Sequence, residues 1–238
     1  MISIENVTYR YKKGKHILKE INLTIPEKET VVIMGKNGSG KSTLGKLISG
    51  IIKPKKGKIL MDDLDMADAK NKEAIRKKIG IVFQNPENQI IFNHVADEVS
   101  FALKGLEEKE IEQRIESSLE KVHMKDKSKE DLYELSLGQK QRVVIAEVLA
   151  KQPKYIVFDE PTTMIDSKGK EEIYQIVEDL KKQGYTIVYI TNVAEEMLLA
   201  DRIIILQEGQ IVEEIKREDL WNRFDVWKQY DMKVPLIV

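Results

Sequence analysis

The chain has no cysteine and almost no net charge, since its 238 residues include 39 Lys and Arg against 40 Asp and Glu. The absence of cysteine excludes a disulfide scaffold, thiolate catalysis and cysteine-ligated zinc. The balanced charge argues against a general binder of polyanions, so no nucleic-acid partner is expected. No apolar run approaches the ~20 residues that cross a bilayer, and the first residues form neither a basic leader nor an apolar signal core. We therefore expect a cytoplasmic protein that borrows any membrane span from another chain.

Apolar residues make up 42% of the chain and charged residues 33%, which is typical of a folded protein. Short β-rich runs alternate with helical stretches, and several of these runs are apolar at consecutive positions. The pattern predicts an α/β fold with parallel core strands buried on both faces. The expected strands are residues 31–34, 79–83, 155–158, 186–191 and 202–206, and the expected helices are residues 41–51, 139–151 and 169–183.

The N-terminal stretch has a different pattern. Residues 2–9 and 17–25 read as half-buried strands joined by a basic turn at residues 12–15, which predicts an antiparallel β layer. Late in the chain, residues 203–212 predict a hairpin whose turn is formed by Glu208 and Gly209.

A charge-dense block at residues 107–131 keeps its apolar residues on one helical stripe. The stripe consists of Ile111, Ile115, Leu119 and Val122. Spacing of i, i+4, i+8 and i+11 makes an amphipathic helix that packs on one face. Because the block lies between expected strands, we expect an inserted helical subdomain over about residues 86–150, within a domain that covers residues 1–212.

The most specific motif follows the first core strand, where residues 35–43 match the pattern G-x-x-x-x-G-K-[ST]. Glycines let backbone N–H groups turn toward phosphate oxygens, and the next helix adds its positive N-terminal end. Lys41 would reach the β and γ phosphates, and Ser42 would give its hydroxyl to Mg²⁺. A glycine-rich turn with a surface lysine is the alternative, but it does not require the flanking strand and helix. The expected nucleotide contacts are Gly35, Asn37, Gly38, Ser39, Gly40, Lys41, Ser42 and Thr43.

Two adjacent carboxylates, Asp159 and Glu160, follow the buried strand expected at residues 155–158. A nucleotide site needs a carboxylate at the end of such a strand. Asp159 would hold Mg²⁺ directly or through water, and Glu160 would polarise the attacking water. Two acids could instead begin a solvated loop, but a complete phosphate loop in the same chain favours the nucleotide site.

Residues 135–142, with the sequence L-S-L-G-Q-K-Q-R, resemble the signature L-S-G-G-Q of the ABC ATPases. The order of motifs agrees with that family: the phosphate loop, Gln84, the signature, the acid pair, a D-loop-like segment at residues 162–166, and a strand that ends before Asn192. The resemblance covers residues 2 to about 212. It implies a P-loop NTPase of the ABC type, with a mixed core sheet, an N-terminal antiparallel β layer and an inserted helical subdomain.

The same resemblance implies roles for residues outside the phosphate loop. Ser136, Gly138 and Gln139 would contact the γ phosphate of ATP bound to a second, facing ATPase, so that one chain holds two half-sites. Gln84 would act at Mg²⁺, and Asn192 stands where most of the family has a switch histidine. An ordinary helix cap at Ser136 is chemically plausible alone, but it does not predict the other motifs. The expected catalytic residues are Lys41, Gln84, Glu160 and Asn192, and the expected Mg²⁺ ligands are Ser42, Gln84 and Asp159.

Tyr11 lies where the family places an aromatic residue that stacks on adenine, although aromatic residues near strand ends are more often only packed there. His16, His94 and His123 each stand alone, without the spacing of metal ligands. We expect all three histidines to be structural or exposed.

Residues 85–89, N-P-E-N-Q, resemble the energy-coupling factor importers and the related cobalt and nickel importers. The resemblance implies an ATP-hydrolysing subunit at the cytoplasmic face of the cell membrane that drives uptake of a vitamin or a transition-metal ion. Residues 90–103 would be a helix facing a transmembrane coupling protein, and a separate membrane component would bind the substrate. Alternatively, the apolar residues of this stretch are simply core. The other functional interpretation is a soluble ABC ATPase acting as a nucleotide-dependent clamp or scaffold, but the long heptad insertions of chromosome-associated ABC ATPases are absent.

Two residues depart from the family pattern. Leu137 replaces the first signature glycine, and Asn192 cannot carry a positive charge or relay a proton as histidine can. A homodimer would contain both departures in each site, whereas a partner ATPase could supply a consensus signature opposite Asn192 and a histidine opposite Leu137. A heterodimer with a similar ATPase is therefore favoured, with the homodimer as the alternative.

The last segment, residues 213–238, is expected to form an aromatic helical tail that contains both tryptophans. Its stripe consists of Leu220, Phe224 and Trp227, spaced i, i+4, i+7. The tail would fold back on its own domain or form a dimer contact. The related importers often continue further, so the apolar end at residues 235–238 is compatible with a shortened C-terminus.

Overall fold

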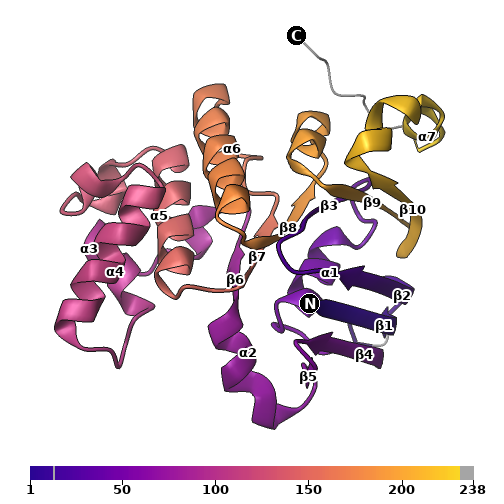
Figure 1. The fold of residues 1–238 in the computed structure, drawn as a ribbon, viewed down its shortest axis with the longest axis horizontal. Helices are drawn as coiled ribbons and strands as arrows, with labels where there is room; N and C mark the ends of the chain where they lie inside the picture. The colour runs from indigo at the N-terminus through magenta and orange to yellow at the C-terminus, as the bar shows by residue number, and fades with distance from the viewer. Residues whose placement is uncertain (13, 231–238) are drawn as a thin grey trace.

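The computed structural model describes residues 1–12 and 14–230, and its strands form two sheets (Figure 1). The larger sheet has six strands in the order β10-β9-β3-β8-β7-β6, parallel except for the antiparallel β10 at its edge. This confirms the mixed core sheet. Its strands are β3 (Thr30–Met34), β6 (Ile79–Val82), β7 (Tyr155–Asp159), β8 (Thr186–Thr191), β9 (Arg202–Gln207) and β10 (Gln210–Lys216).

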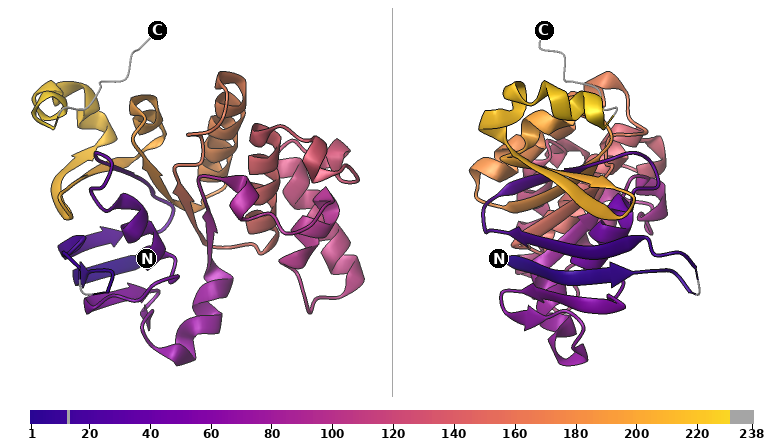
Figure 2. Two further views of the ribbon diagram at one scale, coloured as in Figure 1. Left: turned by 180° about the vertical axis from the view of Figure 1, so that it is seen from behind. Right: turned by 90° about the vertical axis from the view of Figure 1, so that its right-hand side faces the viewer.

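The smaller sheet is antiparallel, with four strands in the order β2-β1-β4-β5. It confirms the N-terminal layer predicted from alternation and extends it with two strands that the sequence pattern did not show. The strands are β1 (Ile2–Tyr9), β2 (Leu18–Ile25), β4 (Lys56–Met61) and β5 (Leu64–Asp65). A short helix, α2 (Lys72–Lys78), leads from this sheet back into β6. The side view in Figure 2 shows the antiparallel layer beside the larger sheet.

Both faces of the larger sheet are covered, which explains the apolar runs at consecutive positions. In β3, Val31 and Ile33 pack in the same cluster as Leu44 of α1 (Lys41–Ile48) and the antiparallel layer. Val32 and Met34 pack in the second cluster, with α5 (Leu137–Ala150) and α6 (Ser167–Lys182). Helices α1 and α5 therefore lie on opposite faces of the sheet.

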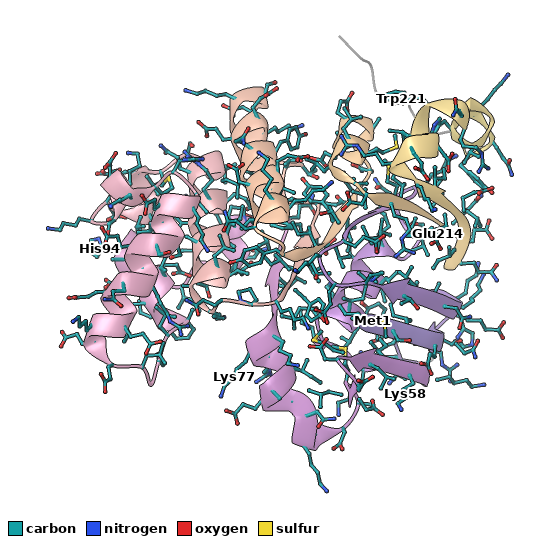
Figure 3. The ribbon with its side chains drawn as sticks, viewed as in Figure 1. Met1, Lys58, Lys77, His94, Glu214 and Trp221 are labelled. Carbon is teal, nitrogen blue, oxygen red and sulfur yellow. The ribbon has the colours of Figure 1, made fainter. Side chains whose placement is uncertain are left out.

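The inserted helices α3 (Val95–Phe101) and α4 (Glu108–Lys121) pack with α5 at one end of the molecule (Figure 1). The predicted stripe on α4 is confirmed, because Leu119 and Val122 are buried while Ile111 and Ile115 pack against the same core. Figure 3 shows His94 at this end and Trp221 beside the C-terminal elements at the other.

The helix predicted at residues 90–103 is wrong in its first turn, since α3 begins only at Val95. The carboxylate of Glu98 in α3 accepts the backbone N–H groups of Ile91 and Phe92 at 2.9 and 2.7 Å, which holds these two residues in a loop before the helix. Val95 is buried, whereas Ile91 is 66% exposed. The stretch is accordingly part core and part apolar surface.

Two helix ends also differ from the sequence prediction. Helix α1 stops at Ile48, three residues before the predicted residue 51, because Gly50 takes the left-handed conformation with φ of 71°. Helix α5 begins at Leu137, two residues before the predicted residue 139, because Ser136 caps it. No helix among the described residues is long and apolar enough to cross a membrane.

The C-terminal segment folds back on the domain. Leu220 is buried and accepts the indole N–H of the fully buried Trp227 at its carbonyl oxygen, 3.2 Å away. Both belong to the cluster that also contains α5 and α6. Helix α7 (Phe224–Gln229) is the last element of the described part, and the side chain of Phe224 and the apolar end noted at residues 235–238 lie outside the described residues. The tail therefore contributes to the core of its own chain.

Candidate functional site

The phosphate loop lies between β3 and α1, and two of its glycines are fixed by crowding. Gly35 has φ of 154°, and a Cβ there would lie 2.1 Å from the carbonyl oxygen of Leu206. Gly40 has φ of 109°, and its Cβ would lie 2.8 Å from Leu18 Cδ2. The Ser39 hydroxyl, which the loop encloses, is buried and has no hydrogen-bond partner among the described residues. A loop built this way can direct backbone N–H groups and the Ser39 hydroxyl toward an anion, although the Ser39 N–H itself donates to the carbonyl oxygen of Lys36 at 3.1 Å.

Lys41 lies in the centre of the loop and is only 4% exposed. Its Nζ donates to the carbonyl oxygens of Gly35 at 2.8 Å and Lys36 at 3.3 Å, and lies 3.8 Å from Glu160 Oε1. Burial lowers the pKa of Lys41, while the carboxylates of Glu160 and Asp159 act in the opposite direction. The ammonium group can therefore donate to the oxygens of a bound phosphate in place of these two carbonyl oxygens.

Ser42 and Asp159 meet across the junction of α1 and β7, where the serine hydroxyl donates to Asp159 Oδ1 at 2.8 Å. Burial raises the pKa of Asp159, and the bond from Ser42 and the charge of Lys46 oppose this shift. A hydroxyl and a carboxylate are the hard oxygen ligands that Mg²⁺ prefers beside nucleotide phosphates. This pair fits a Mg²⁺ ion bound together with a nucleotide.

Glu160 occupies the first position after β7, and its backbone fixes its direction. It has φ of 51°, and its N–H donates to the carbonyl oxygen of Ile190 in β8 at 2.9 Å. The Thr163 hydroxyl donates to Glu160 Oε2 at 3.5 Å. Because Glu160 also faces Lys41, its carboxylate lies at the phosphate loop, where it can accept a proton from an attacking water.

Asn192 comes to the same loop from the end of β8, where its Nδ2 donates to Asn37 Oδ1 at 3.2 Å. The Tyr11 hydroxyl lies 3.4 Å from Thr43 Oγ1, which places this half-exposed ring beside the start of α1. A hollow of about 480 Å³ is lined in part by Tyr11 and Gly38. The structure thus brings Tyr11 and Asn192 to the phosphate loop, as the sequence predicts.

Gln84 is exposed and follows β6, the strand next to β7. The preceding residue is anchored, since Gln141 Nε2 of α5 donates to the carbonyl oxygen of Phe83 at 2.9 Å. Gln84 therefore emerges between β6 and the helical subdomain, and no described contact joins it to Asp159 or Ser42.

The signature residues form a capping box at the start of α5. Gln139 N–H donates to Ser136 Oγ at 3.3 Å, and Ser136 N–H donates to Gln139 Oε1 at 2.9 Å. Gly138 is buried against α6, where an added Cβ would lie 3.5 Å from the Cα of Gly169. Helices α5 and α1 cover opposite faces of the sheet, and no described hydrogen bond or ion pair joins the signature to the phosphate loop of its own chain.

Sequence reasoning missed two buried glutamates, Glu98 and Glu196, each 1% exposed. Glu98 fixes the loop before α3, and Glu196 accepts a hydrogen bond from the Thr162 hydroxyl close to Glu160. Neither stands in a motif of the nucleotide site, and each lies beside an exposed acid, Asp97 or Glu195, so the local sequence does not mark it as buried. Among the described residues no cluster of three or more His, Cys, Asp and Glu could hold a metal ion, and His94 and His16 are exposed.

Comparison with known proteins agrees with this geometry. The family model described as ABC transporter matches residues 18–163. The energy-coupling factor transporter ATP-binding protein EcfA of Syntrophomonas wolfei is 42% identical over 89% of this chain and 79% of that protein. EcfA1 of Mycoplasmoides gallisepticum is 38% identical over 99% of this chain and 85% of that protein.

Solved structures give the same result. The structure of cbiO1 from Clostridium perfringens, described as part of the ABC transporter complex cbiONQ, has a TM-score of 0.86 at 34% identity and covers 96% of this chain and 93% of that one. The dimeric ATP-binding cassette MJ0796 with ADP and Pi has a TM-score of 0.82 at 34% identity, covering 91% and 98%. The chain belongs to the ABC transporter family, as an ATPase of the energy-coupling factor transporter kind.

Proposed function

We propose that this chain is the ATP-binding and ATP-hydrolysing subunit of an energy-coupling factor importer that takes up a vitamin or a transition-metal ion. The main support for the proposal is that Lys41, Glu160 and the hydrogen-bonded Ser42–Asp159 pair all lie at one phosphate loop. Similarity to proteins named energy-coupling factor transporter ATP-binding proteins supports the transport role. ATP with Mg²⁺ is the proposed substrate, and the residues present fit both.

Each residue of the site has a definite part in this reaction. Lys41 and the loop N–H groups would hold the phosphates, with Tyr11 beside the base. Ser42 and Asp159 would hold Mg²⁺. The bound ion would neutralise part of the negative charge of the phosphates. Glu160, 3.8 Å from the Lys41 ammonium, orients the attacking water and accepts its proton. Gln84 and Asn192 would complete the site, the first from β6 and the second from β8.

Residues Ser136, Gly138 and Gln139 serve a second site in this proposal. They would face the γ phosphate of ATP bound to a partner ATPase, and in support of this α5 and α1 pack on opposite faces of the sheet. The partner would be a similar ATPase with a different sequence, because a homodimer would place both Leu137 and Asn192 in each site. The dimeric state of the solved relative MJ0796 supports pairing of this kind.

A membrane location follows from the same proposal. The chain would bind at the cytoplasmic face through a transmembrane coupling protein, and a separate membrane component would bind the substrate. Ile91, 66% exposed, and Phe92, 36% exposed, lie in the loop after Gln84 that would meet the coupling protein. The division into a domain at residues 1–212 and a tail at residues 213–238 stays a prediction of the sequence.

The test combines one variant with one control. Glu160→Gln should lower ATP hydrolysis roughly a hundredfold while ATP still binds, because only the proton acceptor is lost. The closed dimer should then accumulate with ATP, as seen by size-exclusion chromatography. Glu171→Gln, an exposed glutamate on α6, should hydrolyse ATP at the normal rate. Unchanged hydrolysis by Glu160→Gln would remove this residue from its role.

A second experiment separates transport from the soluble alternative. The tagged chain is purified from membranes in mild detergent, and its partners are identified by mass spectrometry. Recovery of a multispanning protein and a second ATPase supports the importer. Recovery from the soluble fraction with neither of them would favour a soluble clamp or scaffold ATPase.

A further inference from the structure

A buried hydrogen bond links the two loops that carry Glu160 and Asn192. The hydroxyl of Thr162 donates to Glu196 Oε1, and both side chains are only 1% exposed. Thr162 stands two residues after Glu160, and Glu196 stands four residues after Asn192. The bond therefore joins the segment after β7 to the 3₁₀ turn Ala194–Leu199 after β8.

This bond is embedded in an incompletely satisfied polar cluster. Among the described residues, Glu196 Oε2 and the Tyr189 hydroxyl of β8 are buried and have no partner within hydrogen-bond geometry. The hydroxyls of Tyr174 and Tyr189 nevertheless lie close to Glu196, because burial raises the pKa of both and the charge of Glu196 raises each further. The carboxylate is therefore buried with one well-formed hydrogen bond, from Thr162, and two tyrosine hydroxyls near it, which costs free energy.

The position of the bond explains why it is useful. Thr162 is held in a tight turn in which Thr163 N–H donates to the carbonyl oxygen of Glu160 at 3.3 Å and Ile165 N–H donates to that of Thr162 at 3.1 Å. Movement of Thr162 would therefore move Glu160. On the other side, Glu196 N–H donates to the carbonyl oxygen of Val193 at 3.3 Å, next to Asn192. A displacement of about 1 Å of a reacting group can lower a rate a hundredfold.

We propose that Glu196 is a positioning residue for ATP hydrolysis, which acts through Thr162 to hold Glu160 and Asn192 in register at the phosphate loop. The carboxylate does not touch the substrate. It ties the ends of β7 and β8 together below the reacting groups, so its loss affects the chemical step more than nucleotide binding. The inference rests on the proposed ATPase function.

The test measures kcat and KM for ATP, and equilibrium binding of N-methylanthraniloyl-ATP, in the transporter complex purified with its partners. Thr162→Val keeps the side-chain shape but removes the donor, and should lower kcat about tenfold with KM and binding within twofold. Thr162→Ser retains the donor and should restore most of kcat. Glu196→Gln should also lower kcat, and the double variant should be no slower than the slower single variant. Glu195→Gln, the exposed neighbour on the same turn, is the matched control.

Each result has one meaning. A normal kcat for Thr162→Val, a Thr162→Ser variant as slow as Thr162→Val, or additive losses in the double variant would overturn the positioning role. Equal losses of kcat and nucleotide binding would also overturn it, because they indicate general disruption. If Thr162→Val does not fold, kcat, KM and nucleotide binding of the nearly isosteric Glu196→Gln are compared with those of the wild type and Glu195→Gln instead. Failure of the wild-type complex to bind or hydrolyse ATP would instead refute the proposed function.

Discussion

Two glycines of the phosphate loop allow the cost of a left-handed backbone to be measured apart from the cost of a steric clash. Gly35 and Gly38 both have positive φ, 154° and 82°, which disfavours other residues. A Cβ at Gly38 meets nothing within 4 Å, whereas one at Gly35 would lie 2.1 Å from a backbone oxygen of Leu206. The position of the loop against β9 therefore depends on Gly35 in particular.

Substitution by alanine should show this difference. Gly38→Ala should lower the free energy of unfolding by roughly 1 kcal/mol through backbone strain alone. Gly35→Ala should lower it by about 3 kcal/mol or more, because the loop and β9 must separate. Urea unfolding of both variants beside the wild type measures the difference. Equal losses would contradict the close approach at Gly35.

The Ser42–Asp159 pair gives a prediction for Mg²⁺. Ser42→Ala removes the hydroxyl that lies 2.8 Å from Asp159, and should raise the Mg²⁺ concentration for half-maximal ATP binding about tenfold. Since Mg²⁺ needs the ionised carboxylate and burial raises the pKa of Asp159, the requirement should also increase as the pH falls through that pKa. Nucleotide titrations at several Mg²⁺ concentrations measure both effects.

A control for this prediction exists at the other end of the same helix. Ser49 follows α1, and its hydroxyl donates to the carbonyl oxygen of Lys46 at 3.2 Å, away from Asp159. Ser49→Ala should leave the Mg²⁺ requirement unchanged. An unchanged requirement in Ser42→Ala would mean that the serine does not contribute to the metal site.

The motif residues could be predicted from sequence because their chemistry requires fixed spacing along a short segment. The loop at Gly35, the acid at Asp159 and the cap at Ser136 are of this kind. Glu196 and Glu98 could not be predicted, because each acts on a residue from another loop or turn and their spacing carries no signal. Burial of a carboxylate depends on the tertiary structure, which a single sequence does not display.

At the scale of elements, prediction succeeded where the apolar pattern fills the element. The core strands are apolar at consecutive positions and α4 has a regular stripe, whereas β4 begins with three exposed residues, 56–58, and β5 has only two residues. The placement of β4 depends on pairing with β1, which is distant in the sequence, and β5 in turn pairs with β4. The first turn predicted before α3 failed for a related reason, since the buried Glu98 carboxylate holds the backbone of Ile91 and Phe92 in a loop.

Helix α5 contains a buried glutamate whose titration should be visible in stability. Glu147 is 8% exposed, and burial raises its pKa to about 7, with Lys151 opposing the shift and Glu98 adding to it. The folded state then holds a proton that the unfolded state releases near pH 4.5. The free energy of unfolding attributable to Glu147 should therefore fall as the pH rises from about 4.5 to about 7, and stay level above it.

Glu147→Gln should remove this dependence and raise the free energy of unfolding above pH 7 by roughly 2 kcal/mol, since no buried charge remains. Urea unfolding between pH 5 and pH 8 measures the difference between variant and wild type. Glu108→Gln, at the first position of α4, is the control and should keep the wild-type pH profile. A parallel profile for Glu147→Gln would show that this carboxyl does not titrate as described.

At the scale of the whole molecule, the placement of α5 agrees with the mechanism proposed. The phosphate loop and the signature begin helices that cover opposite faces of one sheet, and no described hydrogen bond or ion pair joins them. The family resemblance already implies two half-sites in one chain, and the fold adds that each half begins a different helix. Completion of each half by a second chain is part of the proposed function.

The identity of that second chain can be tested through the two departures from the family pattern. In a homodimer each site would combine Asn192 with the opposite Leu137, so the purified chain alone should hydrolyse ATP slowly and without cooperativity. Leu137→Gly together with Asn192→His should raise this rate about tenfold and make it sigmoidal in ATP, while either change alone should do less. Adding the partner ATPase to the unmodified chain should have the same effect. Full, cooperative hydrolysis by the unmodified chain alone would show that a homodimer is the working form.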